Sequence, residues 1–130
     1  MKKLIVDLDN TLTIGETSDY RNVLPNEKSI ETLKKYKDMG FYITIFTSRN
    51  MRTHNGNIGL INVHTLPIIL EWLNRYNVSY DEVVVGKPWC GHDGFYIDDK
   101  AIRPSEFNSL SYEEIKELLE KENSFGKGDN

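Results

Sequence analysis

Short apolar runs alternate with longer amphipathic stretches along this chain. Four runs rich in β-branched and aromatic residues predict strands, at 4–6, 41–46, 82–86 and 95–97. Apolar residues at helical spacing predict two helices, at 27–39 and 66–73, and a Ser-x-x-Glu capping box at Ser111 opens a third that runs to about residue 121. Strands that alternate with helices indicate a parallel sheet with right-handed crossovers, and so a three-layer α/β/α sandwich with a Rossmann-like sheet.

The first strand is the most informative of the four. Its three consecutive apolar residues, Leu4 to Val6, predict burial on both faces of the sheet. The segments 14–24 and 51–64 contain turn-forming residues without a clear period and are predicted as loops, the former as a small flap over the end of the first strand. We expect one catalytic domain over residues 1–122 and a disordered tail over 123–130.

Composition narrows the class of protein. Hydrophobic residues make up 38% and charged residues 28%, which is typical of a globular domain with a buried core. The single cysteine, Cys90, excludes an internal disulfide, and no apolar run reaches transmembrane length. We therefore expect a cytoplasmic protein without a membrane partner. The formal net charge of −4 disfavours a nucleic-acid partner, because phosphate backbones require a basic face.

Polar residues of chemical interest follow every predicted strand. These residues are Asp7 and Asp9, Thr47 and Ser48, Lys87, and Asp98 and Asp99. Taken alone, Asp7 and Asp9 are compatible with a plain acidic turn, since Asp is an ordinary turn residue. In parallel α/β sheets, however, ligands collect beyond the carboxyl ends of the strands, so these side chains are expected to converge.

Four carboxylates, a hydroxyl and an ammonium at one rim suit a phosphate ester and Mg²⁺, which prefers oxygen ligands. Asp7 and Asp98 can supply metal ligands, with Asp99 in support. Asp7 is also the candidate nucleophile, which would form an aspartyl-phosphate, and Asp9 is placed to protonate the leaving oxygen and later to deprotonate water.

Two more side chains complete the predicted chemistry. Thr47 can donate its hydroxyl to a phosphoryl oxygen. Lys87 can neutralise charge that builds on the phosphoryl oxygens in the transition state.

At this point the residues resemble the haloacid dehalogenase (HAD) superfamily of aspartyl-phosphate phosphatases. Its four motifs stand here as Asp7-Leu8-Asp9-Asn10-Thr11, the strand that closes in Thr47, the Lys of Gly86-Lys87-Pro88, and the acidic pair Asp98-Asp99. The resemblance implies that Asp7 is both nucleophile and Mg²⁺ ligand. It implies that Asp9 is the acid and base, and that its backbone carbonyl also binds the metal.

Two other families share part of this pattern but differ in spacing. An EF-hand loop that began at Asp7 would need glycine where Leu12 stands and glutamate where Ser18 stands. A response-regulator receiver domain carries its lysine near the end of the chain, whereas Lys87 precedes the acidic pair here.

Within the superfamily, the segments where a cap domain would be inserted are too short to fold as one. The chain therefore resembles the capless group and, more narrowly, the small bacterial phosphatases of capsule and polysaccharide biosynthesis. That resemblance implies a small sugar phosphate or related phosphomonoester as substrate, with a homo-oligomer, a dimer or tetramer, that closes the site. Ser48, Arg49 and Asn50 are predicted to contact the substrate, the alternative for Arg49 being a solvated loop residue.

Two further functions stay open at this point. An uncapped rim would also admit a phosphorylated macromolecule, either a nucleic-acid end or a phosphoprotein. A HAD-like binding domain without turnover is the third reading, which the complete set of motif residues disfavours.

Overall fold

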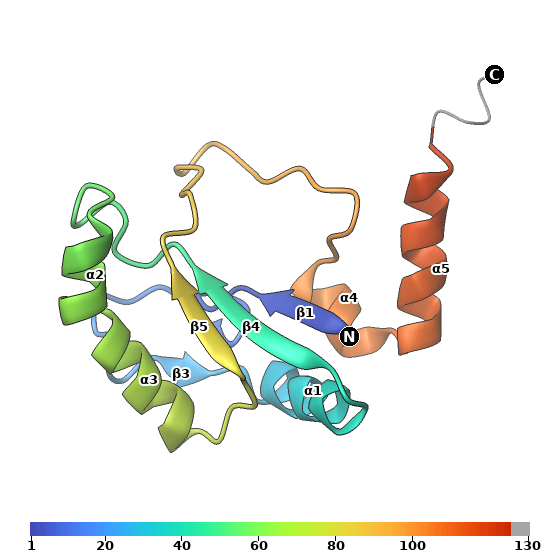
Figure 1. Ribbon diagram of the computed structural model, residues 1–130, viewed down its shortest axis with the longest axis horizontal. Helices are drawn as coiled ribbons and strands as arrows, with labels where there is room; N and C mark the ends of the chain where they lie inside the picture. Colours follow the sequence, from blue (N-terminus) through green and yellow to red (C-terminus); the bar gives the residue numbers. More distant parts are fainter. Residues whose placement is uncertain (126–130) are drawn as a thin grey trace. The chain divides into compact units, whose positions relative to one another are not determined.

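The computed structural model describes residues 1–125, which form two compact units, Met1–Trp89 and a second unit from Cys90 onward. The first unit is built on a three-stranded sheet, in which β1 (Lys3–Val6), β4 (Tyr42–Thr47) and β5 (Glu82–Val85) stand in the order β1-β4-β5. Both pairs of neighbours are parallel (Figure 1). The predicted α/β class with a parallel sheet flanked by helices is confirmed, and the described residues contain no cap domain.

The strand register places the carboxyl ends together. Val6 stands beside Ile45, and Thr47 stands beside Val85. The residues that directly follow these strands, Asp7, Ser48 and Gly86, therefore emerge at the same edge of the sheet. Ile43 and Ile45 of the central strand are fully buried, so the apolar core fixes which face of β4 points inward.

The two crossovers explain why one face of the sheet is covered. Helix α1 (Glu27–Asp38) joins β1 to β4, while α2 (Ile58–His64) and α3 (Leu66–Arg75) join β4 to β5. Both connections step across the sheet in the same direction, and right-handed crossovers in one direction place their helices on the same face. The opposite face of the first unit carries Ile5 and Val84, and burial of the first strand on both faces stays a prediction.

The segment that follows β1 contains more structure than the sequence predicted. Residues expected as a loop or flap include a short antiparallel pair, β2 (Thr13–Ile14) and β3 (Leu24–Pro25). The pair is fastened to α3, because the indole N–H of Trp72 donates a hydrogen bond of 2.9 Å to the carbonyl of Val23. This bond fixes the base of the predicted flap in the core.

The loop predicted over residues 51–64 is wrong in its second half, where α2 forms. The side chain of Asn57 caps that helix and accepts a hydrogen bond of 3.2 Å from the backbone N–H of Leu60. Gly59, one of the turn-forming residues of the predicted loop, lies in the first turn of this helix. The cap and the complete burial of Ile61 outweigh the low helix propensity of glycine.

The second unit contains α4 (Pro104–Ser109), which the sequence analysis did not predict, and α5 (Tyr112–Asn123). The predicted capping box is confirmed, since Glu114 N–H donates to Ser111 Oγ at 3.1 Å and Ser111 N–H donates to Glu114 Oε1 at 2.8 Å. Helix α5 includes Asn123, which the sequence analysis placed in the disordered tail. Residues 126–130 of the predicted tail lie outside the described residues.

The strand predicted over residues 95–97 is wrong, because the structure assigns no strand there. Phe95, Tyr96 and Ile97 are all exposed. Apolar and aromatic side chains favour an extended backbone, but a strand forms only where a neighbouring strand accepts its hydrogen bonds. Across residues 1–125, no helix has the length and apolar character that a membrane crossing requires.

Candidate active site

The turn after β1 is organised around a buried leucine. Leu8 is buried, and its carbonyl oxygen accepts hydrogen bonds from the next turn of backbone, with N–H donors at 3.3, 2.9 and 3.2 Å on Thr11, Leu12 and Thr13. Asn10 takes a positive φ of 61°, which asparagine tolerates better than most residues. With Leu8 anchored between them, Asp7 and Asp9 are both held at the carboxyl end of β1.

Asp7 carries an ion pair and a perturbed proton affinity. Lys87 Nζ lies 3.7 Å from Asp7 Oδ1, and 37% of the Asp7 side chain remains exposed. Burial raises the pKa of Asp7, and the charge of Lys87 opposes this rise without cancelling it. A cation close to Asp7 would therefore be favoured.

Lys87 is positioned by the backbone around it. Its N–H donates a hydrogen bond of 3.1 Å to the carbonyl of Thr47, which fastens the end of β5 to the end of β4. The preceding residue, Gly86, has a φ of 88°, and a Cβ atom there would lie 2.6 Å from Ile58 Cδ1. The positive φ strains any side chain here, and a Cβ atom would also displace the flexible end of Ile58, so glycine is favoured before Lys87.

Thr47 closes the central strand and is buried. Its hydroxyl oxygen accepts a hydrogen bond of 3.1 Å from the backbone N–H of Arg49, which orients the side chain. A hydroxyl both accepts and donates, so its proton can still be directed to a phosphoryl oxygen.

Arg49 is the least exposed charged side chain of the site. It forms a fork with Asp9, in which Nη2 donates to Oδ1 at 2.7 Å and Nε donates to Oδ2 at 3.2 Å. The Arg49 side chain is 1% exposed and that of Asp9 35% exposed. The guanidinium also lies over the ring of Tyr20, 4.3 Å from its centroid. The alternative of a solvated loop arginine is wrong.

The other two predicted substrate contacts, Ser48 and Asn50, lie in the turn after β4. Ser48 is half-buried, and its carbonyl accepts a hydrogen bond from Met51 N–H at 3.0 Å. Asn50 accepts a hydrogen bond of 2.8 Å from Thr65 Oγ1 and donates one of 3.1 Å to Thr53 Oγ1. Asn50 thus holds the turn against the start of α3, and its contact with substrate stays a prediction.

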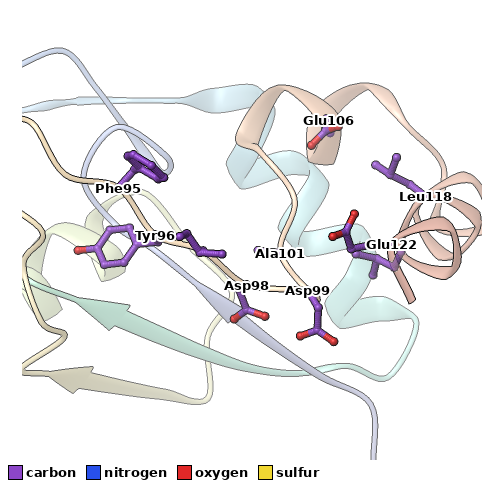
Figure 2. Close-up of a pocket in the computed structure, with 10 residues that line it drawn as sticks. Phe95, Tyr96, Asp98, Asp99, Ala101, Glu106, Leu118 and Glu122 are labelled. Carbon is purple, nitrogen blue, oxygen red and sulfur yellow. The ribbon is translucent and has the colours of Figure 1, made fainter. Parts of the chain in front are cut away.

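Asp98 and Asp99 belong to the second unit. Both line a pocket of 390 Å³ there, together with residues of α4 and α5 (Figure 2). Asp98 Oδ1 accepts a hydrogen bond of 2.9 Å from Lys100 N–H, and both carboxylates are otherwise exposed to solvent. The two units are described separately, so the convergence of this acidic pair with Asp7 stays a prediction.

The donor atoms of the first unit fit a hard divalent cation. Asp7 offers carboxylate oxygens and Asp9 a backbone carbonyl oxygen, and oxygen is the ligand type that Mg²⁺ prefers. Burial of Asp7 without full charge compensation is a further feature that a bound cation would relieve. Within residues 1–125, no group of three or more His, Cys, Asp or Glu side chains lies close enough together to hold a metal ion.

The sequence analysis missed the partnership of Arg49 with Asp9 and the role of Tyr20. Two signals pointed to the partnership. Arg49 follows a strand end next to the strand that carries the acidic turn, and its charge complements that turn. No comparable signal marked Tyr20, because a loop residue reveals its neighbours only after folding.

A comparison with solved structures finds a protein that matches nearly the whole chain. A structural-genomics target protein from Vibrio cholerae is 67% identical, with a TM-score of 0.92 over 94% of this chain and 99% of that chain. The chain belongs to the family of that Vibrio protein. Its designation specifies a target and no activity, so membership of this family leaves the activity to be argued from the site.

More distant likenesses concern the fold alone. A chain of the Pnkp1/Rnl/Hen1 complex is 21% identical, with a TM-score of 0.50 over 84% of this chain, which spans 34% of that chain. The D,D-heptose 1,7-bisphosphate phosphatase from B. bronchiseptica, complexed with magnesium and phosphate, is 14% identical at a TM-score of 0.46, over 73% of this chain and 54% of that one. No family model and no curated protein matches the chain.

Proposed function

We propose that this protein is a phosphatase of the HAD type, which hydrolyses a small phosphomonoester through an aspartyl-phosphate on Asp7. One observation carries the proposal. Two carboxylates, Asp7 and Asp9, are held on either side of a buried leucine, with Lys87 Nζ 3.7 Å from the first of them. Thr47 closes the neighbouring strand at the same edge of the sheet.

The proposed reaction has two steps. Asp7 attacks phosphorus in line, the bond to the ester oxygen breaks, and Asp9 gives its proton to the departing oxygen. Water then attacks the aspartyl-phosphate, Asp9 takes up a proton from that water, and the carboxylate of Asp7 leaves as inorganic phosphate is released. The two steps together consume one water and restore both carboxyl groups.

Lys87 and Thr47 stabilise the charge of the phosphoryl group. Lys87 stabilises the equatorial oxygens in the transition state and keeps Asp7 ionised, which its burial otherwise opposes. Thr47 donates its hydroxyl to one phosphoryl oxygen. When bound, Mg²⁺ would neutralise the phosphate and orient it for in-line attack. The carboxylate of Asp7 and the backbone carbonyl of Asp9 would hold it, and we propose that Asp98 and Asp99 complete the ligand set.

The proposed substrate class is a sugar phosphate of capsule or polysaccharide biosynthesis. Its support is the resemblance of the motif sequences around Thr47, Lys87 and Asp98, together with a net charge of −4, which disfavours long nucleic acids. Ser48 and Asn50 remain proposed contacts for the part of the substrate beyond its phosphate, whereas the Arg49 side chain is 1% exposed and bound to Asp9. Cytoplasmic location and a homo-oligomer belong to the same proposal.

The test is a panel of phosphate esters, read as inorganic phosphate released with Mg²⁺. The panel holds sugar phosphates, nucleotides, 5′- and 3′-phosphorylated oligonucleotides and a phosphopeptide. We expect sugar phosphates to react fastest, chelation to stop turnover and added Mg²⁺ to restore it. Preferred cleavage of the oligonucleotides or the phosphopeptide would instead favour the macromolecular reading.

Variants complete this experiment. Asp7→Asn should lower phosphate release by at least about 1000-fold, because the nucleophile is lost. Asp38→Asn is the matched control, since Asp38 forms a surface pair with Lys34 on α1, and it should leave the rate unchanged. Asp98→Asn should raise the Mg²⁺ concentration needed for half-maximal activity by at least about 10-fold. Full activity in Asp7→Asn would remove that residue from the reaction.

A further inference from the structure

The fork between Arg49 and Asp9 fixes more than charge. Nε and Nη2 of the guanidinium reach different oxygens of the same carboxyl group, at 3.2 and 2.7 Å. Two parallel hydrogen bonds define the plane of the carboxyl group, whereas a single bond would let it rotate. Asp9 is therefore held in one orientation at the end of β1.

The other face of the guanidinium is fixed by Tyr20. The ring lies 4.3 Å from the guanidinium carbon, and Arg49 N–H is bound to Thr47 Oγ1 at 3.1 Å. The arginine is thus held at its backbone, at its plane and at its fork. A side chain held at three points transmits a definite geometry to its partner.

The third nitrogen of the guanidinium, Nη1, contributes no hydrogen bond to stability among the described residues. Nη1 is buried and makes no hydrogen bond within residues 1–125. Buried donors of folded proteins are almost always paired, so an unpaired one needs a reason other than stability. The fork to Asp9 and the stack on Tyr20 supply that reason, because they dictate where the guanidinium lies.

Both oxygens of Asp9 remain usable for chemistry. Each carboxylate oxygen carries two lone pairs, and the fork occupies one on each. The Asp9 side chain is 35% exposed, while that of Arg49 is nearly inaccessible at 1%. The carboxyl group can therefore meet a substrate from one side while the arginine holds it from the other.

We propose that Arg49 is a positioning residue that sets the orientation of Asp9 for proton transfer to the leaving oxygen. The inference deepens the proposed function and rests on it. It differs from a direct substrate contact, because Arg49 would act through Asp9. It also differs from a purely structural ion pair, because replacing Arg49 should slow only those reactions whose leaving group needs a proton.

Substrates whose leaving groups differ in their need for a proton can separate these roles. Benzyl phosphate and p-nitrophenyl phosphate are similar in size, but only the benzyl alkoxide needs a proton as it departs. In Arg49→Lys, which keeps the charge and loses the fork, we expect release of benzyl alcohol in the first turnover to slow by about 10- to 100-fold. Release of nitrophenolate should slow by less than about 3-fold, because this leaving group departs without an acid.

A second variant, Arg49→Ala, tests whether the planar guanidinium group itself is required. Arg49→Ala should regain part of its rate on benzyl phosphate when guanidinium ion is added at millimolar concentration, and an equal concentration of Na⁺ should have no effect. Arg75→Lys is the matched control. Arg75 makes a comparable fork to Glu71 on the surface of α3, and its replacement should leave both esters unaffected.

The outcomes are distinguishable. Equal slowing of both esters in Arg49→Lys, or no change in either, would overturn the inference while the proposed function stands. The same holds if guanidinium fails to rescue a folded Arg49→Ala. A wild-type protein that hydrolyses neither of these esters nor any ester of the panel overturns the proposed function, and the inference with it.

Discussion

Asp7 and Asp9 are two residues apart, yet folding places their carboxyl groups in opposite electrostatic environments. Asp7 loses water and gains a lysine at 3.7 Å, which compensates only in part, so its pKa is raised. Asp9 gains a buried arginine that is bound to both of its oxygens. One turn therefore holds a carboxyl group whose ionised form destabilises the fold and another that neutralises a buried charge.

The first prediction at this scale concerns the stability of the metal-free protein. Because the pKa of Asp7 is raised on folding, its neutral form is favoured in the folded state. The destabilisation is absent below pH 3.8, the ordinary value, and grows as the pH rises through the raised pKa. Asp7→Asn should therefore unfold at higher urea concentration at pH 7, by up to about 1 kcal/mol after allowance for its exposure.

Asp9→Asn is expected to have the opposite effect in the same urea unfolding measurement. Asp9→Asn leaves Arg49 buried without its counter-charge and should lower the free energy of unfolding by at least about 1 kcal/mol. Both changes replace a carboxylate by an amide of the same shape. Equal effects of the two variants at pH 7, or a stabilising effect that persists at pH 3, would contradict this account of Asp7.

At the scale of elements, one carboxylate joins three of them. Asp81, directly before β5, accepts bonds of 2.6 and 2.7 Å from Lys37 Nζ on α1 and one of 2.7 Å from Ile43 N–H on β4. Asp81 N–H also donates to the Ile43 carbonyl at 2.8 Å. These bonds hold the amino ends of the strands together, at the edge opposite to the candidate site.

Asp81→Asn should lower stability with a definite pH dependence. The hydrogen bonds from Lys37 and from Ile43 N–H lower the pKa of Asp81 below its ordinary 3.8. Its contribution is therefore complete above pH 3.8 and is lost as the pH falls through the lowered value.

Urea unfolding between pH 7 and pH 2 measures this contribution. The deficit of Asp81→Asn relative to wild type should shrink over the acid range. Asp38→Asn, which removes only an exposed pair, should show a smaller deficit at pH 7. A deficit of Asp81→Asn that is constant with pH would show that the charge of Asp81 is not responsible.

The elements were predictable to different degrees. Helix α1, strand β4 and the capping box of α5 were evident because each carries its own local signal, a stripe, an apolar run or a cap. Residues 95–97 carried the signal of a strand and form none, since pairing depends on another part of the chain. Helix α2 was hidden by Gly59 and revealed only by the burial of Ile61.

At the scale of the whole molecule, the proposed homo-oligomer concerns the sheet of the first unit. Parallel sheets are normally covered on both faces. The crossover helices of this unit take one face, and Ile5 and Val84 lie on the other. We propose that a second copy of the chain packs on that other face.

Light scattering on the purified protein tests this proposal. We expect two or four times the chain mass of 15.1 kDa. Ile5→Asp should shift the mass toward the monomer, because it places a charge on the apolar face. Val63→Asp is the matched control, since Val63 is equally exposed on α2, and it should leave the mass unchanged. A monomeric wild-type protein at micromolar concentration would contradict the proposal.

The sequence by itself determined the class of fold, strands β1, β4 and β5, and helices α1, α3 and α5, because periodicity and caps act over a few residues. It also selected the acids and the lysine of the candidate site, because only strand ends of a parallel sheet bring such residues to one edge. Tertiary structure alone decided that Arg49 binds both oxygens of Asp9, that Tyr20 lies over the guanidinium and that Gly86 takes a positive φ beside Ile58. Those contacts join residues that are far apart in the chain, so their geometry exists only once the strands are in register.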